Sequence, residues 1–343
     1  MSFLKLAETQ EVNEEINDFD YEKHIIKKDY INSRLNDYIH GRIPKGYGIK
    51  QPLLDNVIVC KINEMVACVG KKGRGKTTIE EILFLMWAMA NNLNFVIALQ
   101  ENDEALEKMN LLAYIFGKSA KDVENEDKEL FKKGVKWMDE HFIFIDVESF
   151  KEALDTTKGI INSGKQVAGL FLDPVNSFDN GWLNTGNVHE DEKKASKKML
   201  KFSKEVCSIF LSQHPTMAGQ RQTEDINSYS AEGGNYLNKA HFTWAINRDN
   251  GSSVNRISVD NIRNKYTGGG VTHPDSPLLL HWSPFKIDIE HEGQRLDDVV
   301  QLIRRRFNPL KEVFTDTNIY EQEKEILTVS PTDAFGTYEE VPF

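Results

Sequence analysis

One short segment, MVACVGKKGRGKTTIEE at residues 65–81, combines glycines, a lysine and a hydroxyl group in a spacing that suits phosphate binding. It satisfies the pattern Gly-x-x-x-x-Gly-Lys-Ser/Thr directly after an apolar run and before a helical pattern. The residues we expect to hold a nucleotide are Gly70, Gly73, Gly75, Lys76, Thr77 and Thr78. Backbone N–H groups would surround the β-phosphate, Lys76 would reach the β- and γ-phosphates, and Thr77 would ligate Mg²⁺. The alternative, a glycine turn with a surface lysine, leaves the order of strand, loop and helix unexplained, so ATP and Mg²⁺ are expected.

Two carboxylates at the ends of later apolar runs have the chemistry to complete such a site. Asp173 ends the run in GLFLDPVNS, where it is expected to help hold Mg²⁺ through water. Its alternative is a turn or helix-capping aspartate before Pro174. Glu101 follows the run in FVIALQEN and is placed to polarise a water over the γ-phosphate. Its alternative is an ordinary glutamate at the start of the next helix.

Two neutral hydrogen-bonding side chains end the run in SIFLSQHP, namely Gln213 and His214. At the edge of a sheet, such a group can sense the γ-phosphate and relay its loss to the loop beyond. Gln213 and His214 compete for this role. A polar residue that merely satisfies its own hydrogen bonds at a strand end is the alternative.

Two cations, Arg263 and Lys265, lie one residue apart in ISVDNIRNKYTGGG at residues 257–270. Side chains two apart on a strand share one face, so the pair is expected to point in one direction. A surface cation pair without catalytic function is the alternative.

These residues need a scaffold, and the sequence supplies short apolar runs separated by helix-length segments. The runs are MVACVG at 65–70, FVIAL at 95–99, FIFID at 142–146, GLFLD at 169–173 and CSIFL at 207–211. This alternation predicts an α/β fold with a mostly parallel central sheet that is covered on both faces. HFTWAIN and SVNRISVDNI read as further strands at closer to hairpin spacing.

Shifts in composition divide the chain into three parts. Residues 1–45 contain a helical segment in which Ile31, Leu35, Tyr38 and Ile39 form one apolar stripe, which needs a partner surface. Residues 46–290 form the main domain. Residues 291–343 contain an amphipathic helix, LDDVVQLIRRRF, and a partly disordered acidic tail.

Composition narrows the class of protein further. At 343 residues and 40% hydrophobic content the chain can bury a large core, and its net charge of −11 argues against a surface that coats nucleic acid everywhere. Three cysteines without a Cys-x-x-Cys pair fit a reducing cytoplasm and disfavour both disulfides and a zinc ribbon. No apolar window reaches membrane-spanning length, and the N-terminus has no secretory pattern.

Taken in order, the motifs over residues 41–290 resemble the ATPase domain of DnaB-type hexameric replicative helicases, including Twinkle-like and phage enzymes. The resemblance implies a RecA-like core, with Glu101 as the catalytic glutamate and LSQHP as the sensor. WAINRD resembles the strand end that implies Arg248 lies near the nucleotide base. IRNKYTGG aligns with a Lys-x-Arg pair that reaches the γ-phosphate across the subunit interface, with Arg263 and Lys265 in reversed order.

The same resemblance implies two DNA-contacting loops, at residues 177–198 and 216–235. The second supplies the candidate DNA-binding residues Arg221, Glu232, Gly233 and Gly234, whose backbone N–H groups can reach a phosphate. Ala231 stands where many DnaB proteins carry arginine, so Arg221 or Lys239 would supply the charge. A mobile polar loop is the alternative.

The expected function is ATP-driven translocation on single-stranded DNA by a ring, without a membrane partner, and unwinding of duplex in the 5′ to 3′ direction by resemblance. The partners expected are further copies of the chain in a hexamer, and a separate primase or loader, because no primase module is visible in the sequence. A RadA- or KaiC-like ATPase without unwinding activity is one alternative. A phage packaging motor or virion-associated ATPase is the other.

Overall fold

The computed structural model describes residues 22, 25–179, 181–182, 186–215, 234–307 and 310. Its α-helices are α2 (Lys28–Ile39), α3 (Pro52–Asp55), α4 (Lys76–Asn91), α5 (Glu104–Phe116), α6 (Ala120–Glu126), α7 (Lys128–His141), α8 (Phe150–Asn162), α9 (Val188–Glu205), α12 (Gly234–Leu237) and α13 (Val299–Phe307). Its strands are β1 (Met65–Gly70), β2 (Phe95–Leu99), β3 (Phe142–Phe144), β4 (Gly169–Asp173), β5 (Ser208–Gln213), β6 (Phe242–Arg248), β7 (Val254–Ile262), β8 (Leu278–Ser283), β9 (Lys286–His291) and β10 (Gln294–Leu296). Two short 3₁₀ turns are η2 (Val175–Ser177) and η3 (Lys265–Thr267).

All ten strands form one sheet in the order β10-β9-β8-β7-β6-β1-β5-β4-β2-β3. The six strands from β6 to β3 in this order run parallel, and β7 to β10 continue the sheet in antiparallel hairpins. The predicted α/β fold with a mostly parallel central sheet is confirmed, and each predicted apolar run is a strand. The hairpins formed by β8, β9 and β10 were not expected from the sequence.

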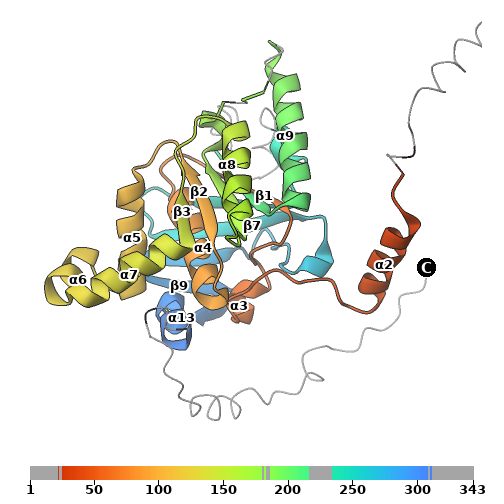
Figure 1. Ribbon diagram of the computed structural model, residues 1–343. Coiled ribbons are helices and arrows are strands. Elements are labelled where there is room, and N and C mark those ends of the chain that lie inside the picture. Colours follow the sequence, from red (N-terminus) through yellow and green to blue (C-terminus); the bar gives the residue numbers. More distant parts are fainter. Residues whose placement is uncertain are drawn as a thin grey trace, which may run out of the picture.

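Helices cover both faces of the sheet, as its fully apolar strands require (Figure 1). One face packs against α4, α5, α7 and α13, and the other packs against α8 and α9. Phe84 of α4 lies at the centre of the first layer, with its ring 5.0 Å from that of Phe171 and 4.9 Å from that of Phe210. These aromatic contacts fix the helix that follows the glycine-rich loop against the middle of the sheet.

Parallel strands bring the predicted site residues to one edge of the sheet. In the register of the sheet, Val69 pairs with Gln213, Leu99 pairs with Asp173, and Gly70 pairs with Ile246 close to Arg248. The carboxyl ends of five strands therefore meet there, which is where open α/β sheets bind their ligands.

The two ends of the described chain differ in how they pack. No residue of α2 is buried, and Figure 1 shows this helix lying apart from the sheet. Its one aromatic contact with the core is Tyr38 against Tyr266, with ring centroids 5.0 Å apart. By contrast, Val299, Val300 and Ile303 of α13 are buried in the core, so the packed domain extends beyond the expected boundary at 290.

No helix among the described residues is long and apolar enough to cross a membrane. The acidic tail after residue 310 lies outside the described residues, as does most of the predicted DNA loop at 216–235.

Candidate nucleotide-binding and catalytic site

The glycine-rich loop joins β1 to α4 and needs glycine at two positions. Gly73 and Gly75 have φ angles of 73° and 78°, a left-handed conformation that side chains rarely adopt. Gly75 immediately precedes the first residue of α4, and a Cβ atom there would lie 3.4 Å from Asn255 Nδ2. The loop backbone and the N-terminus of α4 therefore form the kind of cradle that binds phosphate.

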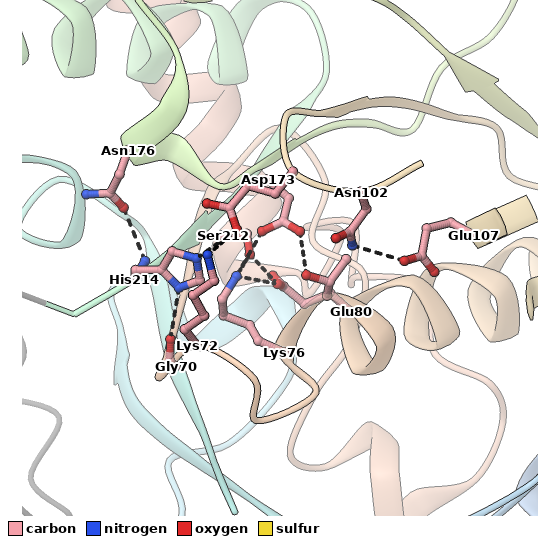
Figure 2. A network of polar contacts seen from close by, with 12 residues as sticks. Gly70, Lys72, Lys76, Glu80, Asn102, Glu107, Asp173, Asn176, Ser212 and His214 are labelled. Atoms are coloured by element: carbon pink, nitrogen blue, oxygen red, sulfur yellow. Dashed lines mark hydrogen bonds and ion pairs between the residues drawn. The ribbon is translucent and has the colours of Figure 1, made fainter. Parts of the chain in front are cut away.

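Lys76 lies at the centre of a buried polar network (Figure 2). Its Nζ atom donates to Asp173 Oδ1 at 2.8 Å and to the Ser212 hydroxyl. Thr77 Oγ1 donates to Asp173 Oδ2 at 2.5 Å. Burial alone would raise the pKa of Asp173, but Lys76 and the hydroxyl donors hold that pKa below its ordinary value. Asp173 is thus an ionised carboxylate aimed at the loop, and the alternative of a helix cap is wrong.

Glu80 adds a second carboxyl group to this network. It is 1% exposed, accepts a hydrogen bond from Ser212 Oγ at 2.7 Å, and lies 4.0 Å from Lys76 Nζ. Burial raises the pKa of Glu80 to about 8, and the Lys76 ammonium partly opposes that rise. Ser212 therefore connects the lysine of the loop to a carboxyl group that is easily protonated.

Glu101 lies beside the loop, 3.5 Å from Lys72 Nζ and 3.7 Å from His214 Nε2. It precedes α5, which begins at Glu104 and is capped by the Asp103 side chain. The alternative that Glu101 starts a helix is therefore wrong. Its carboxylate is 38% exposed, so it is accessible from the pocket.

The structure separates the two candidate phosphate sensors. His214 lines the pocket together with Glu101, and its Nδ1 atom lies 3.4 Å from the carbonyl oxygen of Gly70. Asn176 Oδ1 accepts from the His214 backbone N–H at 3.2 Å. Gln213 ends β5 with only 3% of its surface exposed. His214 is the one of the two that lies in the pocket.

A cavity of about 300 Å³ lies over this loop. Lys71, Lys72, Gly73, Gly75, Lys76, Thr77, Thr78, Glu101, Asn102, Glu107, Asp173 and His214 line it. On its acidic side, Asn102 Nδ2 donates to Glu107 Oε1 at 3.0 Å. Burial, with Glu107 next to it, raises the pKa of Glu81 well above its ordinary value. Glu81 is therefore a neutral acid, which leaves Glu107 as the charged member of this pair.

A second cavity adjoins the first at Gly75 and Thr78. Its other walls are Ile79, Arg248, Asn255 and Trp282. Arg248 Nη2 donates to the Gly73 carbonyl at 3.0 Å, and Asn255 Nδ2 donates to the Arg74 carbonyl at 2.7 Å. Trp282 Nε1 donates to the Tyr114 hydroxyl, which fixes the indole at the rim. An arginine and an aromatic ring beside a phosphate loop are suited to holding a planar base.

The oxygen atoms of Thr77 and Asp173 fit the preference of Mg²⁺ for hydroxyl and carboxylate ligands. Among the described residues there is no group of three or more histidines, cysteines or acids that could hold a metal by itself. That pattern suits an ion bound jointly by a few protein oxygens and substrate phosphates.

The cation pair is not on a strand, so the prediction that Arg263 and Lys265 share a strand face is wrong. β7 ends at Ile262, and Lys265 begins the turn η3, because the Asn264 side chain accepts a hydrogen bond from Tyr266 N at 3.2 Å. Both cations are exposed.

The pair also lies at the edge of the sheet opposite the loop. Arg263 N donates to the carbonyl of His241 at 2.8 Å, directly before β6 begins, whereas Arg248 at the end of β6 contacts the loop. Along the parallel strands the two edges are about 17 Å apart, at about 3.3 Å per residue. The pair therefore cannot complete the site of its own chain.

Of the predicted DNA-binding residues, Arg221, Glu232 and Gly233 lie outside the described residues. Gly234 is the first residue of α12. Sequence reasoning did not find Lys72, Glu80, Ser212, Asn255 and Trp282. Lys72, Glu80 and Ser212 lie inside or next to recognised motifs, and that proximity was the available signal. Asn255 and Trp282 come from the hairpin region, where no motif marked them.

No family model matches the chain, and no curated protein matches it. Among solved structures, it is similar to the ATPase domain of a phage helicase, with a TM-score of 0.59 and 12% identity over 79% of this chain and 98% of that chain. It is similar to a DnaB-like replicative helicase, described with its interactions with primase, with a TM-score of 0.59 and 12% identity over 76% of this chain and 66% of that chain. A third likeness, to the RadB recombinase, has a TM-score of 0.46 and 10% identity over 70% of this chain and 98% of that chain.

At these identities the first two likenesses establish the fold. The chain has the RecA-like ATPase fold that DnaB-type helicases share, and its glycine-rich loop makes it a P-loop NTPase by fold and motif.

Proposed function

We propose that the chain is an ATP-driven replicative DNA helicase that works as a ring. The observation that carries the proposal is the position of Arg263 and Lys265 at the sheet edge opposite Lys76. A second subunit that docks this edge against the phosphate pocket would bring the two cations to the nucleotide. Such an arrangement repeats from subunit to subunit and closes into a ring, for which we propose six members.

Within one site, each side chain has a defined task. Lys76 neutralises phosphate charge, and Glu101 accepts the proton of the attacking water. His214, held between Gly70 and Asn176, donates a hydrogen bond toward the terminal phosphate and is the proposed sensor. Mg²⁺, held by Thr77 and Asp173, would supply charge neutralisation on the transferred phosphate. Arg248 and Trp282 hold the base.

Movement would follow from the chemistry because His214 leads directly into the predicted DNA loop at 216–235. Loss of the phosphate changes the hydrogen bond of His214, and the loop beyond it shifts with the bound strand. We propose single-stranded DNA as the track, with Arg221 and the backbone of Glu232, Gly233 and Gly234 as its contacts. A separate primase or loader is a proposed partner, since one structural neighbour is described with primase.

A fork-unwinding assay with ATP and Mg²⁺ tests this proposal on the purified full chain. Wild type is expected to displace the labelled strand, and Lys76→Ala is expected to lose both displacement and ATP hydrolysis. A matched control is Lys121→Ala, which removes an exposed lysine of α6 that lines neither nucleotide cavity. Wild-type protein that assembles and hydrolyses ATP yet displaces no strand from either fork polarity would contradict the helicase proposal.

A further inference from the structure

A buried lysine, Lys61, lies at the edge of the sheet opposite the phosphate-binding loop, just before β1. It is 1% exposed. Its Nζ atom donates to Thr267 Oγ1 at 3.2 Å and to the carbonyl oxygen of Gly268, and it lies 4.7 Å from the ring centroid of Phe242. Burial lowers the pKa of Lys61. A buried ammonium is costly, so its contacts with residues 267 and 268 are what hold it there.

Glu64 completes the cluster from the same segment. It is 5% exposed, and its Oε1 atom accepts a hydrogen bond from Thr267 Oγ1 at 2.8 Å. Burial raises the pKa of Glu64, and the nearby Lys61 opposes that rise. The hydroxyl of Thr267 therefore lies between a buried cation and a buried acid and contacts both. None of these three side chains lines either nucleotide cavity.

Thr267 belongs to the turn that carries the cation pair. It is the last residue of η3, of which Lys265 is the first, and Arg263 lies two residues before that turn. The backbone is held as well, because Gly46 N donates to the Thr267 carbonyl at 2.9 Å and Gly270 N donates to the Val57 carbonyl at 3.2 Å. The base of the turn is thus buried and bonded, while both cations are exposed.

We propose that Lys61 and Glu64, acting through Thr267, are positioning residues that hold Arg263 and Lys265 in place for catalysis in the neighbouring subunit. This inference rests on the proposed function. Two long, exposed side chains must arrive at a nucleotide on another molecule, and small displacements at their base become large losses in rate. A support built from buried charges fixes the turn at the point where its own backbone would otherwise be free.

The first test uses Thr267, because its hydroxyl joins the two charged groups. Thr267→Val keeps the shape and removes the hydroxyl, and Thr267→Ser keeps the hydroxyl. In assembled protein, Thr267→Val is expected to lower kcat for ATP by about tenfold or more, with KM within about twofold, because the valine variant's own nucleotide pocket is intact. Thr267→Ser is expected to restore most of kcat. Equal kcat in wild type and Thr267→Val, or a loss that serine does not restore, would overturn the inference.

A mixing experiment then separates this inference from the proposed function. Lys76→Ala subunits lack a working site but keep an intact cation turn, and Thr267→Val subunits have the reverse. In a one-to-one mixture about one interface in four joins the two intact halves, so ATP hydrolysis is expected to rise above that of either variant alone. The double variant Arg263→Ala, Lys265→Ala, mixed in the same way, is the reference.

Each outcome of the mixture decides the matter. Recovery with both the reference and Thr267→Val supports the inference. Recovery with the reference alone shows that the cations act between subunits but that Thr267 does not position them, which overturns the inference and leaves the proposed function standing. Recovery with neither shows that the pair has no role between subunits, and both proposals then fail. Thermal unfolding and size-exclusion profiles that match wild type confirm that each variant folds and assembles.

Discussion

His214 Nε2 and Lys72 Nζ both face the same oxygen of Glu101, at 3.7 Å and 3.5 Å. The carboxylate comes from the loop after β2, the histidine from the end of β5, and the lysine from the glycine-rich loop. Three segments that are far apart in the sequence thus meet at one oxygen atom. A carboxylate held in this way is oriented toward the pocket and available as a general base.

Replacing Glu101 by glutamine is therefore expected to lower kcat for ATP hydrolysis by about 10²-fold to 10⁴-fold, the usual contribution of a general base. Nucleotide affinity should change little, because Lys76 and Thr77 remain. Steady-state hydrolysis and equilibrium binding of a fluorescent ATP analogue measure the two effects separately. Glu104→Gln, at the first position of α5, is the matched control and should behave as wild type. A Glu101→Gln variant with near-normal kcat would exclude Glu101 as the base.

Trp282 gives a prediction for nucleotide affinity. Its ring lines the cavity beside Arg248, so Trp282→Ala is expected to weaken ATP binding by about 1–2 kcal/mol, or roughly 5-fold to 30-fold. Its effect on kcat should be small, because the ring is remote from Glu101 and His214. Tyr114→Phe removes only the hydroxyl that accepts from the indole, and a smaller change in affinity is expected. Titration calorimetry with ATP and ADP measures both variants, and an unchanged affinity in Trp282→Ala would show that the cavity does not hold the base.

The sequence was sufficient where chemistry and local pattern coincide. The loop at 70–77, Asp173, Glu101 and His214 each follow a buried parallel strand, and such strands place their ends at one edge. Trp282 and Asn255 could not be predicted, because antiparallel hairpins bring them to the loop and nothing nearby in the sequence marks them. The on-strand orientation of Arg263 and Lys265 failed for a local reason, since the side chain of Asn264 starts a turn that ends the strand pattern.

Glu80 makes stability depend on pH in a defined direction. Its pKa in the folded protein is about 8, above the ordinary 4.5, so the folded state binds more protons than the unfolded state between these values. The free energy of unfolding should therefore fall as pH rises through this window, by about 1 kcal/mol per pH unit from this group. Glu80→Gln should remove that contribution.

Urea unfolding of wild type and Glu80→Gln at pH 5.5, 6.5 and 7.5 measures the effect. The glutamine variant should gain stability relative to wild type at each step upward in pH. Glu205→Gln, at the exposed end of α9, is the control and should give a constant difference. A difference between Glu80→Gln and wild type that is equally constant would show that Glu80 titrates in its ordinary range.

The apolar stripe of α2 predicts a separation of assembly from stability. Ile31 and Leu35 are 50% and 54% exposed, so the double variant Ile31→Asp, Leu35→Asp should change the free energy of unfolding of the single chain by less than about 0.5 kcal/mol. If the stripe docks on a neighbouring subunit, as we propose, the two charges must be buried there without partners. Assembly should then weaken by tenfold or more. Sedimentation velocity with ATP and Mg²⁺ measures this, and Ser33→Asp, on the opposite face of α2, is the control. Rings that form equally well in both variants would assign the stripe to another surface.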